Sequence, residues 1–189
     1  MSQKKIQVYL MPGMAASGLI FEHIRLPSEK FELHVLEWKT PQKGYNIAQY
    51  ANEMCKLIKH ENPVLIGVSF GGLLVQEMAK IIPVLKVIVV SSIKQKSELP
   101  KRMLFARYTS IHKLLPTGLI NNVELLAKYA FGETVVKRLE LYEKYLSIRD
   151  KSYIDWCIHE MVNWQQVVSD DKVVHIQGEK DSVFPVKNI

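Results

Sequence analysis

The segment around Ser69 constrains the fold more than any other part of the chain. A short apolar run, Val64–Val68, reaches Ser69, and a helical pattern begins at once. A strand that becomes a helix within one residue forces that residue into a strained backbone conformation and makes its side chain protrude. Glycine is needed two positions before and after, where the backbones nearly touch. Gly67 and Gly71 meet this requirement, and the alternative is an ordinary glycine-rich turn with a surface serine.

Short runs rich in Val and Ile recur along the chain and alternate with helical patterns. The predicted strands are Ile6–Met11, Leu33–Trp38, Val64–Val68, Val87–Val90 and Val173–Gln177. Segments of helix-plus-loop length separate the first four, which is typical of βαβ units. Apolar residues at helical spacing between Ile47 and Ile58 predict an amphipathic helix packed on the sheet. We therefore expect an α/β fold, with a mostly parallel sheet and flanking helices.

This alternation stops after Ser92, and helical patterns alone follow as far as Gln166. One apolar face comprises Val135, Leu139, Tyr142 and Leu146, and a second comprises Ile154, Ile158, Met161 and Gln165. We expect residues 93–166 to form a helical cap, inserted after the fourth strand and lying over the carboxyl edge of the sheet. Residues 1–92 and 167–189 would then form the core. The alternative is that these helices simply cover one face of the sheet.

The composition favours a soluble globular protein, with 48% hydrophobic and 23% charged residues. The net charge of +6 is not gathered into a basic stripe, so we expect no nucleic-acid partner. No apolar run approaches the roughly 20 residues that cross a bilayer, so we expect no membrane association. A secretory leader is the alternative for the N-terminal stretch, but Gln7 and Pro12 interrupt it.

The two cysteines, Cys55 and Cys157, lie far apart, with no Cys/His cluster at metal-ligand spacing. This argues against a disulfide framework and a zinc site, and is compatible with a reducing cytoplasm. We expect neither a metal nor a cofactor.

Two loops beside the predicted turn carry further candidate groups. After the first strand, a glycine-rich loop could direct the backbone N–H of Met14 at an oxyanion, together with the N–H of Phe70. The alternative is a plain strand-to-helix connection. The loop after the last strand carries two acids, Glu179 and Asp181. We prefer Asp181 as the carboxylate that orients a histidine, over a purely solvated role.

Together these motifs resemble the α/β-hydrolase family over essentially the whole chain. Gly67–Gly71 is similar to its nucleophile elbow, with Ser69 as the nucleophile. Pro12-Gly13-Met14-x-x-Ser17 resembles its His-Gly-Phe-x-x-Ser oxyanion loop, although Pro12 replaces the histidine. Gly178-Glu179-Lys180-Asp181-x-x-x-Pro185 resembles the turn that carries its acid, and residues 93–166 match its variable cap. The chain begins at what would be the third strand of that family.

The resemblance also implies a catalytic histidine beyond the acid, after one more strand, but the sequence stops eight residues after Asp181. The six histidines are His23, His34, His60, His112, His159 and His175, and none is at the expected position. We therefore expect a further C-terminal piece that holds a strand, a helix and the histidine. Without it, Val173–Gln177 would be an exposed apolar edge strand through which a homodimer could form.

The resemblance implies a serine hydrolase of the carboxylesterase kind. It would act on a small ester or thioester through an acyl-enzyme intermediate, with a small molecule as its partner. Aromatic residues of the cap would suit a small apolar group or would only pack the cap, namely Phe105, Tyr108, Tyr129, Phe131, Trp156 and Trp164. The alternatives are an acyltransferase or lyase on the same scaffold, and a member that binds a small molecule without turnover.

Overall fold

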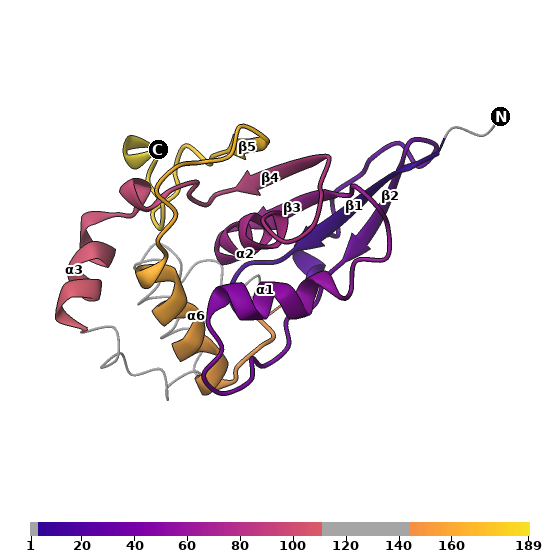
Figure 1. Ribbon diagram of the computed structural model, residues 1–189. Helices are drawn as coiled ribbons and strands as arrows, with labels where there is room; N and C mark the ends of the chain where they lie inside the picture. The colour runs from indigo at the N-terminus through magenta and orange to yellow at the C-terminus, as the bar shows by residue number, and fades with distance from the viewer. Residues whose placement is uncertain (1–3, 111–143) are drawn as a thin grey trace.

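The computed structural model describes residues 4–110 and 144–189, and Figure 1 shows their arrangement. The strands are β1 (Ile6–Met11), β2 (Phe31–Val35), β3 (Val64–Val68), β4 (Lys86–Val90) and β5 (Val173–Ile176). The α-helices are α1 (Ile47–Cys55), α2 (Phe70–Ala79), α3 (Lys101–Thr109) and α6 (Lys151–Asn163), and the 3-10 turns are η1 (Gly18–Phe21), η2 (Lys96–Glu98) and η6 (Val186–Asn188). The five strands form one sheet in the order β2-β1-β3-β4-β5, and every pairing is parallel. The expected α/β class is confirmed.

The second strand lies earlier in the chain than the sequence predicted. The prediction was Leu33–Trp38, whereas β2 ends at Val35, which pairs with Leu10. One more backbone hydrogen bond, from the Leu36 N–H to the Leu10 carbonyl at 2.8 Å, closes the ladder between β1 and β2. Leu36 and Trp38 lie beyond the strand end and are buried in the core, so their apolar character comes from this burial and not from a longer strand.

Helix α1 follows the predicted amphipathic pattern but ends at Cys55 instead of Ile58. A capping box begins it: the Asn46 side chain accepts from the Gln49 N–H at 2.9 Å, and the Gln49 side chain accepts from the Asn46 N–H at 3.0 Å. Beyond Cys55 the chain turns, and Ile58 still packs against the core. The strand boundaries of β4 and β5 differ from the predictions by one residue each.

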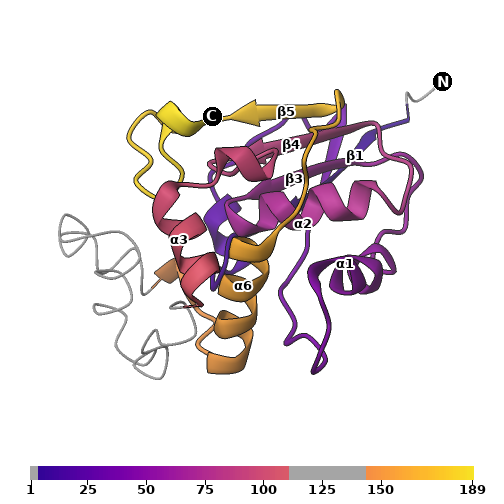
Figure 2. The ribbon, with the colours of Figure 1, turned by 60° about the vertical axis from the view of Figure 1, so that its left-hand side comes forward.

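The core lies mainly on one side of the sheet. Helices α1 and α2 both lie on that side (Figure 2), and their apolar residues join those of β1, β3 and β4 in one large cluster. On the other side a smaller cluster centres on Val8, Leu10 and Phe21, below η1. Further along that second face, the β5 side chains Val174 and Ile176 are exposed.

Within the described residues, the segment between β4 and β5 is helical, as expected. Helices α3 and α6 lie together at the end of the sheet towards which β5 points (Figure 2). Tyr153 and Ile148 both hydrogen-bond to the backbone of Ala15, in the loop that follows β1, so this segment reaches the carboxyl edge. Four buried residues of α6 also belong to the large core cluster, namely Tyr153, Ile154, Cys157 and Met161. The division into a core and a cap stays a prediction.

The two predicted apolar faces of this segment have different outcomes. Ile154 and Met161 of α6 are buried and Ile158 packs beside them, whereas Gln165 lies beyond the helix end and is exposed. The first face falls mostly outside the described residues, at Val135, Leu139 and Tyr142. In the described ranges, no helix is long and apolar enough to cross a membrane. Cys55 and Cys157 are both buried and free.

Candidate active site

Ser69 lies at the turn between β3 and α2, where the sequence predicted a strained residue. Its φ of 52° and ψ of −120° fall in a region that residues with a Cβ rarely adopt. Hydrogen bonds hold both sides of its backbone: its N–H donates to the Val90 carbonyl at 2.9 Å, and its carbonyl accepts from the buried hydroxyl of Ser92 at 2.7 Å. The side chain of Ser69 lies partly exposed at the carboxyl edge of the sheet.

The glycines around Ser69 are required by close backbone packing. A Cβ placed on Gly67 would lie 2.3 Å from the Gly71 carbonyl oxygen, and one placed on Gly71 would lie 2.4 Å from the Pro12 carbonyl oxygen. A Cβ placed on the next residue, Gly72, would lie 2.4 Å from the Ser92 hydroxyl oxygen. The turn therefore packs directly against the loop after β1 and the loop after β4.

The loop after β1 passes against Ser69. A Cβ placed on Gly13 would lie 3.4 Å from the Ser69 Cβ, which is ordinary contact distance. In the described part of the chain, neither the Met14 N–H nor the Phe70 N–H donates to a protein acceptor. The structure thus brings together Ser69 and the two residues expected to supply oxyanion donors.

Asp181 lies on the loop after β5, half-buried and held by three hydrogen bonds. Its Oδ1 accepts from the N–H groups of Val183 at 2.7 Å and Phe184 at 3.0 Å, and its Oδ2 accepts from the Gln177 side chain at 3.1 Å. Glu179, the competing acid, is exposed. Strand β4 lies between β5, which precedes the Asp181 loop, and β3, which leads to Ser69. The Asp181 loop and the turn at Ser69 both lie at the carboxyl edge of the sheet.

The described histidines do not hydrogen-bond directly to Ser69 or Asp181, although the Gln177 side chain contacts both His175 and Asp181. His175 Nε2 lies 2.9 Å from Gln177 Oε1, His34 Nε2 lies 2.7 Å from Gln7 Oε1, and His60 Nδ1 lies 2.8 Å from Tyr9 Oη. His23 lies beside Glu22, His159 lies beside Asn163, and His112 falls outside the described residues. In the part of the chain that the structure describes, no histidine donates a hydrogen bond to Asp181.

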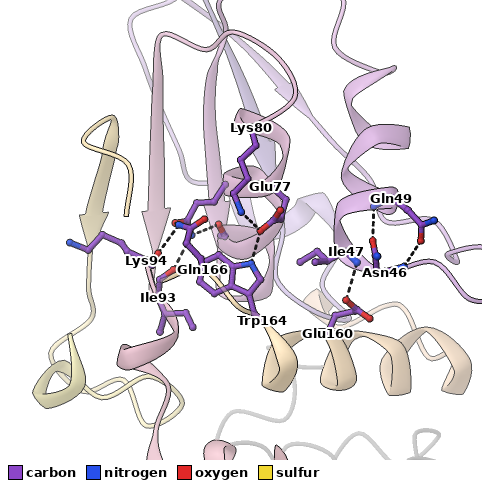
Figure 3. Close-up of polar contacts among 12 residues, drawn as sticks. Asn46, Ile47, Gln49, Glu77, Lys80, Ile93, Lys94, Glu160, Trp164 and Gln166 are labelled. Atoms are coloured by element: carbon purple, nitrogen blue, oxygen red, sulfur yellow. Dashed lines mark hydrogen bonds and ion pairs between the residues drawn. The ribbon is translucent and has the colours of Figure 1, made fainter. Parts of the chain in front are cut away.

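Helix α2, which begins beside Ser69, also holds both ends of the segment inserted between β4 and β5 (Figure 3). The buried Gln76 side chain donates to the Ile93 carbonyl at 2.9 Å and accepts from the Gln166 side chain at 2.9 Å. Gln166 also donates to the Lys94 carbonyl at 2.7 Å. The first and last residues of the predicted cap are therefore tied to each other and to α2.

The next residue of α2 is Glu77, whose carboxylate accepts from the Trp164 indole N–H at 2.7 Å and from Lys80 Nζ at 2.5 Å (Figure 3). Trp164 is only 3% exposed, so it packs the insertion against α2.

The other cap aromatics differ in position. The half-buried ring of Trp156 meets Phe70 edge-on, with centroids 5.7 Å apart. Phe105 and Tyr108 are largely exposed on α3. Tyr129 and Phe131 lie outside the described residues.

Two residues that the sequence did not single out hold the loop after β1. The Trp38 indole N–H donates to the Pro12 carbonyl at 3.1 Å and to the Gly13 carbonyl at 2.9 Å. The Tyr153 hydroxyl accepts from the Ala15 N–H at 3.3 Å. Burial raises the pKa of Tyr153 far above its usual range, so this hydroxyl stays protonated. Nothing in the sequence pattern distinguished these aromatics from ordinary core residues.

The hollow over α1 lies apart from the candidate site, and the described residues offer no metal site. A hollow of about 600 Å³ lies over α1, and none of the site residues borders it. The residues around it are Tyr45, Asn46, Ala48, Gln49, Asn52, Glu53 and Ile81. Within residues 4–110 and 144–189, no three His, Cys, Asp or Glu side chains gather as metal ligands would.

No family model and no curated protein matches the chain, but solved structures do. A lipase-esterase related protein from Clostridium acetobutylicum is 18% identical, with a TM-score of 0.67 over 100% of this chain and 80% of that one. A hydrolase from Pseudomonas aeruginosa is 13% identical, with a TM-score of 0.70 over 97% and 76%. An esterase from Exiguobacterium antarcticum is 17% identical, with a TM-score of 0.63 over 99% and 78%. The chain has the α/β-hydrolase fold.

Proposed function

We propose that this protein is a serine hydrolase that acts on a small ester or thioester through an acyl-enzyme intermediate on Ser69. The observation that carries the proposal is the strained turn at Ser69, packed against a loop whose Met14 N–H donates to no protein acceptor among the described residues. The hydrolase and esterases with the same fold are consistent with it.

In the proposed reaction, the Ser69 Oγ attacks the substrate carbonyl carbon and forms a tetrahedral intermediate. The N–H groups of Phe70 and Met14 stabilise its oxyanion, and the start of α2 adds a partial positive charge at the same point. Collapse of the intermediate expels the alcohol or thiol, and water then releases the acid from Ser69. Asp181 orients the histidine that accepts the Ser69 proton. That histidine is not among the donors to Asp181 in the described residues.

A fluorophosphonate probe and short-chain p-nitrophenyl esters test this proposal on the wild type, Ser69→Ala and Ser110→Ala. Ser110 is the matched control because it also has a positive φ, of 55°, but lies at the end of α3. We expect the wild type and Ser110→Ala to be labelled and to hydrolyse esters. We expect Ser69→Ala to lose labelling and at least about 10³-fold in kcat. Labelling that persists in Ser69→Ala would refute the assignment of the nucleophile.

The second candidate is a protein that binds a small molecule without turnover. The specific observation in its favour is that, among the described residues, no histidine donates a hydrogen bond to Asp181. Binding of a non-hydrolysable ester analogue by a wild type that no probe labels would support this function over the hydrolase.

A further inference from the structure

Trp38 occupies an unusual position relative to the candidate site. It lies three residues after β2 and is 7% exposed, so its indole N–H needs a protein acceptor. It donates to two successive carbonyl groups, those of Pro12 and Gly13, at 3.1 and 2.9 Å. Both belong to the loop that passes against Ser69.

The direction of the Met14 N–H follows from this contact. The Gly13 carbonyl and the Met14 N–H belong to the same peptide group, and in a trans peptide they point in opposite directions. When the Gly13 oxygen is held on the Trp38 indole, the Met14 N–H is therefore directed away from Trp38. The Ala16 N–H donates to the same Gly13 oxygen at 3.1 Å, which fixes the peptide group further.

The same indole ring also contacts the residue that carries the other expected donor. The Trp38 and Phe70 rings stack with centroids 5.4 Å apart and an interplanar angle of 18°. The Trp38 ring also packs against the Tyr153 ring, with centroids 5.5 Å apart, and the Tyr153 hydroxyl accepts a hydrogen bond from the Ala15 N–H. Ala15 has a φ of 64°, a conformation that needs support from its surroundings. One side chain thus contacts both halves of the candidate oxyanion site.

We propose that Trp38 is a positioning residue for the oxyanion site: its indole N–H orients the Gly13–Met14 peptide group so that the Met14 N–H is available to the substrate oxyanion. The inference rests on the proposed hydrolase function, because only a reaction through an oxyanion needs this donor. Trp38 itself does not touch the reacting atoms.

Trp38→Phe tests the proposal, because phenylalanine keeps an aromatic ring but has no N–H. Trp164→Phe is the matched control, since it removes a buried indole N–H whose acceptor, Glu77, is outside the site. With p-nitrophenyl esters, we expect Trp38→Phe to lower kcat about 10- to 100-fold with KM within about twofold, because the lost interaction acts mainly in the transition state. Trp164→Phe should keep the wild-type kcat. An unchanged kcat in Trp38→Phe, or an equal loss in both variants, overturns the proposal.

A second measurement separates failure of this proposal from failure of the hydrolase function. If the wild type shows no probe labelling and no turnover, the hydrolase function fails, but the backbone effect can still be measured. We expect the ¹⁵N order parameter of the Met14 amide to fall from about 0.85 to below about 0.6 in Trp38→Phe, and to stay unchanged in Trp164→Phe. A Met14 amide that stays rigid in Trp38→Phe shows that the indole does not position this peptide group.

Discussion

At the scale of single residues, Gly67 shows how closely the nucleophile turn is packed. We expect Gly67→Ala to lower the free energy of unfolding by about 2–4 kcal/mol, because the added methyl group would lie 2.3 Å from the backbone oxygen of Gly71. Backbone cannot move aside as the end of a flexible side chain can. Urea unfolding followed by circular dichroism measures the change.

Gly178→Ala is the matched control for that substitution. Its added Cβ would lie 3.4 Å from the Ser91 hydroxyl, an ordinary contact, so we expect a change within about 0.5 kcal/mol. If Gly67→Ala were as stable as Gly178→Ala, the turn would be looser than the structure shows.

The same scale shows why the sequence predicted some site residues and missed others. Ser69 could be predicted because its requirement is local: a strand, one residue, a helix and two glycines. Trp38 could not be predicted, because its contact depends on where β2 stops and on the path of a loop some 25 positions earlier in the chain. Its sequence position suggested the end of a strand. The predicted catalytic roles of Ser69, Met14, Phe70 and Asp181 stay predictions.

At the scale of helices, Glu160 connects α6 to the first turn of α1 (Figure 3). Its carboxylate accepts from the Ile47 N–H at 2.9 Å. Burial is the main cause of a raised pKa at Glu160, and the hydrogen bond from Ile47 opposes it. The folded chain therefore binds this proton more tightly than the unfolded chain. This contribution to stability is fully present below the unfolded pKa, and it is lost as pH rises through the folded pKa.

Glu160→Gln tests this sign. The neutral amide can still accept from Ile47 but has no charge to bury. We expect the variant to be slightly more stable than the wild type at pH 7, by less than about 1 kcal/mol because the group is half-exposed, and equally stable near pH 4. Thermal unfolding from pH 4 to pH 8 measures the difference. A variant that is less stable at pH 7 would show that the charge of Glu160 favours the start of α1.

Asp150 gives the opposite sign and serves as the comparison. It caps α6 by accepting from the Tyr153 N–H at 3.1 Å, and the hydrogen bond from Ser152 is the main cause of its lowered pKa. Its contribution is present above the unfolded pKa and is lost as pH falls through the folded pKa. Asp150→Asn keeps a capping acceptor but loses the charge. We therefore expect the variant to be less stable than the wild type mainly above pH 4, and equally stable in acid.

At the scale of the whole molecule, the two faces of the sheet are covered unequally. Helices α1 and α2 bury one face, while on the other the smaller cluster around Val8, Leu10 and Phe21 covers β1 and part of β3. Over β4 and β5, Ile88 and Val90 are only half-buried, and Val174 and Ile176 are 40% and 54% exposed. The parallel order of the strands followed from their spacing in the sequence. The unequal covering of the two faces could not be predicted from the sequence, because it depends on which face of the sheet each connection between strands crosses.

The exposed edge of β5 leads to a prediction about assembly. Among the described residues β5 pairs only with β4, and the Val87 and Ser91 N–H groups donate to the Lys172 and Ile176 carbonyls. Along a strand, the backbone N–H and carbonyl groups of successive residues point to opposite sides. The groups of Ile176 point to β4, so those of His175 point away from β4, to the free edge. Two copies paired antiparallel about His175 would place Val174 of one opposite Ile176 of the other. For the chain as printed, without the further strand expected beyond residue 189, we therefore expect a homodimer through this edge.

Ile176→Lys should weaken this dimer, because two buried ammonium groups would face the apolar contact, while Leu19→Lys adds the same charge to an exposed position on η1. We expect sedimentation velocity to show a concentration-dependent dimer for the wild type and for Leu19→Lys. Ile176→Lys should be monomeric at the same concentrations, with a Tm within a few degrees because the position is exposed in the monomer. A wild type that stays monomeric up to about 100 μM would exclude this edge as a dimer interface, because an interface weaker than that contributes less than about 6 kcal/mol.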